Sequence, residues 1–259
     1  MCYLQRILDR KRQEVVELKR GRPKELYVRL SGTLPSCRDF SGVLRRPEGG
    51  GLRLIAEIKK ASPSRGVIFR QFDPEALAGL YLGCGASAFS VLTDREFFQG
   101  SNDYLKTVRR RFSLPLLRKD FIIDEHQIYE SRLIGADAVL LIVAILSRTQ
   151  LVEYLQLASA IGLASLVEVH DFDELACAVE AGAAVIGVNN RNLKDFTVCL
   201  DTSVELRPHL PDGVLSVSES GLKSEEDVER VASAGFDAVL IGEGLCVNPA
   251  LQRLAWKGS

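Results

Sequence analysis

Residues 133–142 read LIGADAVLLI, and variants of this stretch recur as LGCGASAFSV at 82–91, EAGAAVIGV at 180–188 and SAGFDAVLIG at 233–242. Each copy places a glycine where a helix would end in a left-handed cap. A small or acidic residue follows, and then an apolar run typical of a buried strand. The repeat therefore predicts helix-to-strand junctions at several places along the chain.

Apolar runs rich in valine, isoleucine and leucine continue from Leu52 to the last copy of the repeat and alternate with helical stretches. They lie at 52–59, 86–93, 114–119, 137–143, 164–169, 184–189, 213–218 and 237–242. Asp73-Pro74 and Asn248-Pro249 are typical helix starts, and Ser224 to Asp227 resembles a capping box. Eight such units predict an α/β fold, a (β/α)₈ barrel. An open doubly wound sheet is the alternative, but no GxGxxG segment follows the first run.

The segment before the first run has a different character. Residues 1–46 hold 12 basic and 5 acidic residues, a net charge of +7, so the remainder of the chain carries −8. A helical pattern places apolar residues on one face: Leu4, Ile7, Leu8, Val15 and Leu18. We predict an amphipathic helix whose basic side faces solvent, with nucleic-acid binding or attraction of an anionic substrate as alternatives. We therefore divide the chain into an N-terminal helical extension, 1–46, and a barrel catalytic domain, 47–259.

Composition limits the classes of partner. A formal net charge of −1 argues against nucleic acid or a membrane bound through bulk charge. The longest apolar stretch, Ala138 to Leu146, is too short to span a bilayer, and the first 13 residues lack the apolar core of a secretory signal. We expect a cytoplasmic protein. The cysteines have no CxxC spacing, so we expect reduced thiols and no metal: Cys2, Cys37, Cys84, Cys177, Cys199 and Cys246.

Polar residues stand at the carboxyl ends of the predicted strands, where the loops of a barrel ring one mouth. They are Glu57 and Lys59 on the first run, Lys119 on the third, Glu168 on the fifth, Asn189 to Arg191 on the sixth, and Ser218 to Gly221 on the seventh. Inward charges are unfavourable in a small barrel unless they pair. A structural ion-pair network would satisfy that requirement, but so many charges converging from different strands favour a catalytic cluster.

Glycines follow the last two strands, in Ser220-Gly221 and in Gly242-Glu243-Gly244. There backbone N–H groups can approach an anion closely, and phosphate sites in such barrels often use these two loops. The sequence therefore predicts a phosphorylated small-molecule substrate. The polar loop 60–66 after the first strand is either a cover for that substrate or a solvated turn.

At this point the residues resemble a known family, the indole-3-glycerol phosphate synthases of tryptophan biosynthesis. The matching segments are AEIKKASPS at 56–64, SVLT at 90–93, LRKDF at 117–121, LVEVH at 166–170, IGVNNRNL at 186–193 and SESG at 218–221. The resemblance implies closure of the ring of a phosphorylated carboxyphenylamino-deoxyribulose, with release of carbon dioxide and water. It implies no cofactor and no metal.

The resemblance also implies roles for individual residues. Lys119 would be the general acid of ring closure, Lys59 would hold the substrate carboxylate, and Glu168 would be the base of dehydration, supported by Glu57. The implied catalytic set is completed by Asn189 and Ser220. The implied substrate-binding set is Arg191, Phe121, Phe98 and Leu140, and the implied phosphate-binding set is Ser62, Gly221, Gly242 and Glu243, with Ser220 beside it. Gly244 departs from the serine or alanine common in the family. The Glu243 charge would repel phosphate, so we expect its side chain to point away.

A related barrel, phosphoribosylanthranilate isomerase, is the rival enzyme. It typically uses a cysteine at the end of the first strand and an aspartate at the end of the sixth, where this chain has Glu57 to Lys59 and Asn189. An inactive barrel kept as a subunit would be expected to lose an acid–base residue, and none is lost. We expect a monomer. The protein partners that the resemblance suggests are other tryptophan-pathway enzymes, bound weakly.

Overall fold

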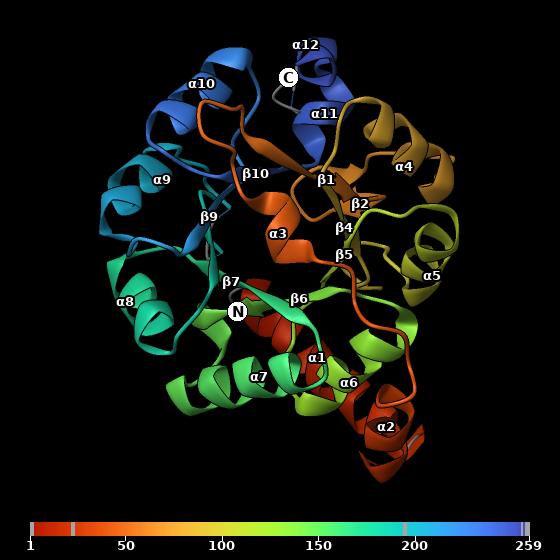
Figure 1. Cartoon of the computed structure of the whole chain (residues 1–259). Helices are drawn as coiled ribbons and strands as arrows, with labels where there is room; N and C mark the ends of the chain where they lie inside the picture. The colour runs from red at the N-terminus through yellow and green to blue at the C-terminus, as the bar shows by residue number, and fades with distance from the viewer. Residues whose placement is uncertain (1–2, 22–23, 194–195, 255, 257–259) are drawn as a thin grey trace.

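Eight parallel strands close into a barrel at the centre of the molecule, and Figure 1 shows helices ringing it. The computed structural model describes residues 3–21, 24–193, 196–254 and 256. Around the ring the strands follow the order β1-β10-β9-β8-β7-β6-β5-β4. Their bounds are β1 Arg53–Ile58, β4 Ala88–Leu92, β5 Leu116–Lys119, β6 Ala138–Ile142, β7 Ala164–Val169, β8 Val185–Asn189, β9 Leu215–Glu219 and β10 Ala238–Ile241. The predicted (β/α)₈ barrel is confirmed. Each predicted run coincides with one strand, although β9 extends one residue beyond its run, to Glu219.

The helices between the strands begin where the sequence predicted caps. Asp73 and Asn248 accept backbone N–H groups ahead of Pro74 and Pro249, and Ser224 forms the expected capping box with Asp227. The bounds are α4 Pro74–Gly83, α5 Asn102–Arg111, α6 Glu125–Ile134, α7 Arg148–Ala160, α8 Phe172–Glu180, α9 Asp201–Leu206, α10 Glu225–Ser233, α11 Glu243–Val247 and α12 Pro249–Arg253, with 3₁₀ turns η1 Val143–Ile145 and η2 Arg207–His209.

The N-terminal extension forms three helices, α1 Tyr3–Gly21, α2 Lys24–Ser31 and α3 Phe40–Leu44. In Figure 1, α3 lies over the near opening of the barrel, α2 stands beside α6, and α1 lies behind the barrel. Phe40 and Leu44 of α3 are fully buried in the cluster that fills the barrel interior. The extension therefore covers the barrel closely, and the domain boundary between residues 46 and 47 stays a prediction.

The predicted amphipathic helix is present as α1, but its buried face carries a charge. Lys11 lies between Ile7 and Val15 on that face, and only 1% of its surface is exposed. The hydrophobic pattern treats lysine as polar, so the sequence placed it with the solvated basic residues. A lysine can be buried at this position because carboxylates meet its ammonium group.

Three further observations concern only the described part of the chain. There, no helix combines the length and apolar character that crossing a bilayer requires. The five cysteines within those ranges are free thiols, and Cys2 lies outside them. No group of three histidine, cysteine or acidic side chains among the described residues is placed to hold a metal ion.

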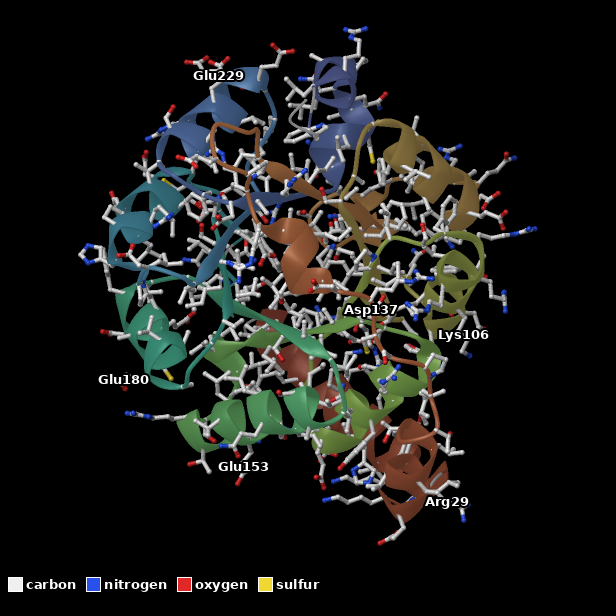
Figure 2. All side chains as sticks on the ribbon, viewed as in Figure 1. Arg29, Lys106, Asp137, Glu153, Glu180 and Glu229 are labelled. Atoms are coloured by element: carbon white, nitrogen blue, oxygen red, sulfur yellow. The ribbon has the colours of Figure 1, made fainter. Side chains whose placement is uncertain are left out.

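One acidic residue of the repeated stretch fixes how strands meet. Asp137, immediately before β6, is fully buried, and Figure 2 shows it inside the molecule while labelled charged residues such as Glu153 lie at the periphery. Its carboxylate accepts the backbone N–H groups of Leu116 at 2.9 Å and Arg38 at 2.8 Å, and it pairs with Arg109 at 2.7 Å. Asp237 accepts the N–H of Ser216, one strand before β10, at 2.8 Å in the same way.

We expect Asp137→Ala to lower the free energy of unfolding by about 2–4 kcal/mol, because the half-buried Arg109 guanidinium and two backbone N–H donors lose their acceptor. Urea unfolding followed by circular dichroism measures the change. The matched control is Glu153→Ala on the exposed face of α7, where we expect a change within about 0.5 kcal/mol. A loss no larger for Asp137→Ala than for the control would contradict this account.

Candidate active site

A cavity of about 350 Å³ opens at the carboxyl ends of the barrel strands. All the predicted site residues except Ser62 line it: Glu57, Lys59, Phe98, Lys119, Phe121, Leu140, Glu168, Asn189, Arg191, Ser220, Gly221, Gly242 and Glu243. A volume of this size suits a small organic ligand. The structure therefore brings residues from β1, β4, β5, β6, β7, β8, β9 and β10 and their following loops to one place.

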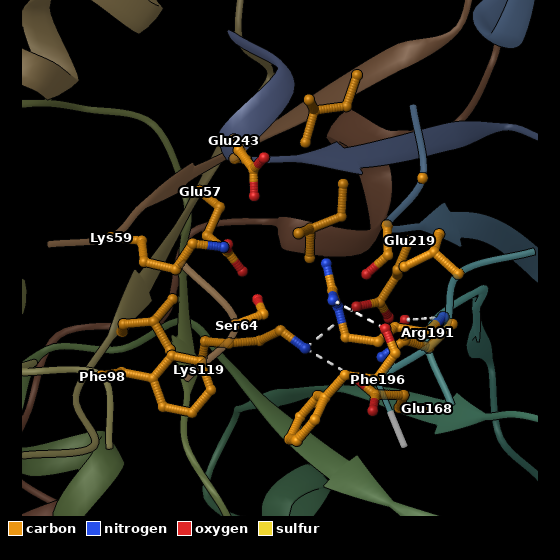
Figure 3. Close-up of a pocket in the computed structure, with 18 of the residues that line it drawn as sticks. Glu57, Lys59, Ser64, Phe98, Lys119, Glu168, Arg191, Phe196, Glu219 and Glu243 are labelled. Atoms are coloured by element: carbon orange, nitrogen blue, oxygen red, sulfur yellow. Dashed lines mark hydrogen bonds and ion pairs between the residues drawn. The ribbon is translucent and has the colours of Figure 1, made fainter. Parts of the chain in front are cut away.

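Lys119 at the end of β5 contacts two carboxylates across the barrel. Its Nζ lies 2.7 Å from Oε2 of Glu168 on β7 and 3.1 Å from Oε2 of Glu219 on β9, as Figure 3 shows. Burial opposes the ammonium form, but the charges of Glu168 and Glu219 outweigh it and raise the pKa of Lys119 above its usual value. Lys119 is therefore a cation held at the centre of the cavity.

Glu219 also lines the cavity, although it was not among the site residues predicted from the sequence. Burial, together with the charge of Glu168, outweighs Lys119 and raises the pKa of Glu219 to about 7. Among the described residues, its Oε1 has no hydrogen-bond partner. A signal was present in Gly187: a Cβ there would lie 2.1 Å from Oε1 of Glu219, so the glycine leaves space for this carboxylate.

Glu57 and Lys59, at the end of β1, form an ion pair with each other on another side of the cavity. The prediction that both face inward is confirmed. Gly242 makes room for Glu57, because a Cβ at that position would lie 2.6 Å from its Oε1. Lys59 therefore offers its ammonium group near the loop that follows β10.

Glu168 has a second cationic neighbour, His170. The imidazole Nε2 lies 3.3 Å from Oε1 of Glu168, and Nδ1 lies 2.9 Å from Oε2 of Glu174. Burial opposes ionisation of Glu168, but Lys119 and His170 outweigh it and hold its pKa well below the usual range. Burial also disfavours the imidazolium, yet the neighbouring carboxylates of Glu168 and Glu174 raise the pKa of His170 to about 10. Glu168 is thus an ionised base between two cations.

This environment makes stability depend on pH. The pKa of His170 rises from 6.5 to about 10 on folding, so its stabilising contribution is complete below pH 6.5 and is lost as the pH rises through 10. We expect the free energy of unfolding to fall over that interval, and His170→Gln to flatten the fall. Urea unfolding at pH 6.5, 8 and 10 measures it, with exposed His209→Gln as the control. Equal slopes in His170→Gln and the parent protein would contradict the assignment.

The edge of the cavity after β9 has an unusual backbone. Ser220 and Gly221 both have positive φ, +65° and +84°, a region that serine rarely adopts. Asn190 stabilises this turn by donating from Nδ2 to the Ser220 carbonyl at 3.0 Å. A Cβ at Gly221 would lie 2.9 Å from Val198, so this close approach favours glycine. The backbone conformation and these contacts together fix the shape of this strand end.

Two expectations about the adjoining loops change. The Glu243 side chain does not point away: its carboxylate turns toward the cavity in Figure 3 and pairs with Arg65 at 2.5 Å. The Arg65 guanidinium offsets the negative charge of Glu243, which was the reason for expecting this side chain to point away from the cavity. The loop 60–66 is a small hairpin of β2 Ala61–Ser62 and β3 Gly66–Val67, and Ser64 rather than Ser62 lines the cavity. The two serine hydroxyls lie 3.4 Å apart.

Apolar residues line the opposite side. The rings of Phe98 and Phe121 lie with centroids 6.1 Å apart, and both line the cavity together with Leu140 of β6. Arg191 donates its backbone N–H to Oδ1 of Asn189 at 3.0 Å, and its guanidinium donates to the Phe196 carbonyl at 3.3 Å. The cavity therefore has a charged centre, a glycine-rich edge and an aromatic wall.

Fold and site together define an enzyme of the (β/α)₈-barrel class that performs acid–base chemistry on a small anionic substrate. The sequence profile of the indole-3-glycerol phosphate synthase family matches residues 4–255. The chain belongs to that family. It is a carboxy-lyase of tryptophan biosynthesis, which converts 1-(2-carboxyphenylamino)-1-deoxyribulose 5-phosphate to indole-3-glycerol phosphate, carbon dioxide and water.

Individual relatives agree with the family match. The chain is 65% identical over 257 residues to the indole-3-glycerol phosphate synthase of Chlorobium limicola, covering 99% of each chain, and 61% identical to that of Pelodictyon phaeoclathratiforme, covering 99% of this chain and 100% of the relative. Among solved structures, an N-acetylmannosamine-6-phosphate 2-epimerase from Clostridium perfringens matches with a TM-score of 0.61 at 10% identity, over 82% of this chain and 93% of its own. That likeness concerns the barrel fold alone.

Proposed function

We propose that the cavity is the active site of this reaction, with the substrate phosphate at the edge formed by Ser220, Gly221 and Gly242 and the carboxyphenyl ring against Phe98 and Phe121. The observation that carries the proposal is the position of Lys119, which lines the cavity in contact with two buried glutamates. A substrate anchored at both ends would present its carbonyl group to the Lys119 ammonium.

Ring closure forms a bond between the ring carbon that bears the carboxylate and the C2 carbonyl carbon of the ribulose chain. Lys119 donates a proton or a strong hydrogen bond to the carbonyl oxygen as its negative charge develops. Because its pKa is raised, Lys119 stays charged at neutral pH but is a weak proton donor. Stabilisation of the developing negative charge on the carbonyl oxygen is therefore the larger part of its role. Lys59 holds the carboxylate, which then leaves as carbon dioxide when the bonding pair returns to the ring.

Dehydration removes the hydroxyl group that ring closure leaves on the former C2 carbonyl carbon. A proton is lost from the neighbouring carbon of the new five-membered ring, so that the two leave as water. Glu168 is ionised and in contact with Lys119, so it serves as the base in this step. Glu219, with a pKa near 7, holds or accepts a proton beside it. Glu57 supports proton transfer through Lys59, while Asn189 and Arg191 orient the chain of the substrate.

The reaction releases carbon dioxide and water, and nothing is oxidised or reduced overall. We therefore propose turnover without a cofactor or metal. We also propose a cytoplasmic monomer. The net charge of −1 argues against a nucleic-acid or membrane partner that binds through bulk charge. Weak association with other tryptophan-pathway enzymes stays a prediction.

The phosphate end is tested by Glu243→Gln, which keeps the backbone N–H and removes the carboxylate that pairs with Arg65. We expect the Ki of inorganic phosphate, a competitive inhibitor, to fall by about threefold or more, since a repelling charge disappears and Arg65 is freed. The matched control is Glu229→Gln on the exposed side of α10, which should leave the Ki unchanged. An unchanged or higher Ki in Glu243→Gln would place the phosphate elsewhere.

A further inference from the structure

We propose that Lys11 of the N-terminal helix α1 is a positioning residue for the known reaction: its ammonium group holds Phe98 and Phe121 at the spacing that receives the carboxyphenyl ring. The inference rests on the proposed function of these two rings. Lys11 does not line the cavity, so it would act through the loops that carry them.

Three carboxylates meet the Lys11 ammonium group. Its Nζ lies 2.7 Å from Oδ1 of Asp120, 2.9 Å from Oδ2 of Asp94 and 2.8 Å from Oε2 of Glu14 on its own helix. The Lys11 side chain is 2% exposed, that of Asp94 is fully buried and that of Asp120 is 3% exposed. Asp94 follows β4 and Asp120 follows β5, so one cation joins two neighbouring loops of the barrel mouth.

Each of these two aspartates also accepts backbone N–H groups of aromatic residues in its own loop. Oδ1 of Asp94 accepts the N–H groups of Phe97 at 2.8 Å and Phe98 at 3.1 Å. Oδ1 of Asp120 accepts the N–H of Phe121 at 2.8 Å. The path from Lys11 to each ring therefore passes through one carboxylate and one backbone hydrogen bond.

The two aspartates depend on Lys11 to different degrees. Asp120 has other partners, the Arg118 guanidinium at 3.3 Å and the Thr93 hydroxyl at 2.5 Å. Among the ion pairs of the described residues, Asp94 pairs with Lys11 alone. Removing the lysine would leave two carboxylates in a buried region with one cation fewer, so we expect them to separate or to take up a proton. Either change alters the spacing of the two aromatic loops.

A simple tether between α1 and the barrel would explain a buried lysine equally well, so the experiment has to distinguish tethering from positioning. Lys19 supplies the matched control, because its Nζ pairs with Oδ2 of Asp124 at 2.6 Å and also joins α1 to the barrel. Lys19 is 46% exposed, and its partner Asp124 caps α6 at the end of the same loop that carries Phe121. The Asp124 carboxylate accepts the backbone N–H of His126 and not that of an aromatic residue beside the cavity. Lys19→Met should leave catalysis unchanged.

The test compares two competitive inhibitors, N-(2-carboxyphenyl)glycine for the aromatic wall and inorganic phosphate for the glycine edge. We expect Lys11→Met to raise the Ki of the aromatic compound at least about tenfold while the Ki of phosphate stays within about twofold, because only the aromatic loops are displaced. The double variant Lys11→Met/Asp94→Asn removes the unpaired charge and keeps an acceptor for the Phe98 N–H. It should recover part of the lost affinity.

Equal losses for both inhibitors, or no loss for the aromatic one, would overturn the proposal. Thermal unfolding of each variant is measured in parallel to show that it is folded. If Lys11→Met does not fold, the Ki values of the two inhibitors are compared in the double variant Lys11→Met/Asp94→Asn instead. Phe121→Ala checks the proposed function separately. If Phe121→Ala leaves the aromatic Ki unchanged, the assignment of the wall is wrong, whereas a loss in Phe121→Ala without one in Lys11→Met removes only the role of Lys11.

Discussion

Lys119→Met is expected to lower kcat by about 10³–10⁴-fold, because the charge that stabilises the developing oxyanion disappears from the centre of the site. Methionine is close to lysine in length and keeps the apolar stem in place. The phosphate edge and the aromatic wall are unaltered, so we expect the affinity for substrate to change by less than about tenfold. Glu168 and Glu219 lose their shared cation, and one of them should then bind a proton at neutral pH.

The measurement combines steady-state turnover, followed by the fluorescence of the indole product, with a binding titration of the substrate to the inactive variant. The matched control is Lys106→Met, an exposed lysine of α5 that pairs with Asp103. It should retain full kcat. A Lys119→Met enzyme that keeps a tenth or more of the parent kcat would remove Lys119 from the chemical step.

Glu168→Gln is expected to lower kcat by about 10²–10⁴-fold, since an amide preserves the shape of the side chain but takes no proton. Lys119 would keep Glu219 as a partner, and the fold around β7 would be retained. The neutral amide also removes one of the two carboxylates that hold His170 in its charged form, so the pKa of His170 should fall toward its ordinary value.

Glu57→Gln provides the comparison that identifies the base. Glu57 pairs with Lys59 and is not in an ion pair with Lys119 among the described residues, so we expect a loss of kcat at least about tenfold smaller than in Glu168→Gln. Turnover and the pH profile of kcat are measured for both variants. A larger loss in Glu57→Gln than in Glu168→Gln would exchange the roles of the two glutamates.

The sequence predicted the barrel, and all but one of the site residues selected from it line the cavity, because both depend on local patterns. Strand ends such as those at Lys119 and Glu168 follow directly from apolar runs, and a barrel gathers strand ends at one mouth. Ser62 was predicted as a site residue by its motif, but the β2–β3 hairpin brings Ser64 to the cavity instead. A motif identifies a loop more reliably than the residue of that loop that faces inward.

Features that depend on distant partners were not predictable in the same way. Lys11 and Asp120 are 109 positions apart in the sequence, and nothing in the helix pattern of α1 distinguishes Lys11 from its exposed basic neighbours. Arg65 neutralises Glu243 from another loop, which reverses the expected direction of that side chain. Glu219 reaches Lys119 only because β9 lies opposite β5 in the closed barrel. Gly187 leaves the space that the Glu219 carboxylate occupies.

The aspartates before β6 and β10 have a consequence for the barrel as a whole. Asp137 joins β6 to the start of β5, and Asp237 joins β10 to the start of β9, each through a backbone and a side-chain hydrogen bond. In the order of strands around the ring, these two junctions lie diametrically opposite. A closed ring has a fixed shear, so a strand slips only if another compensates. Two opposed aspartates lock the register of both half-barrels, which keeps the acidic and basic groups at the mouth level with one another.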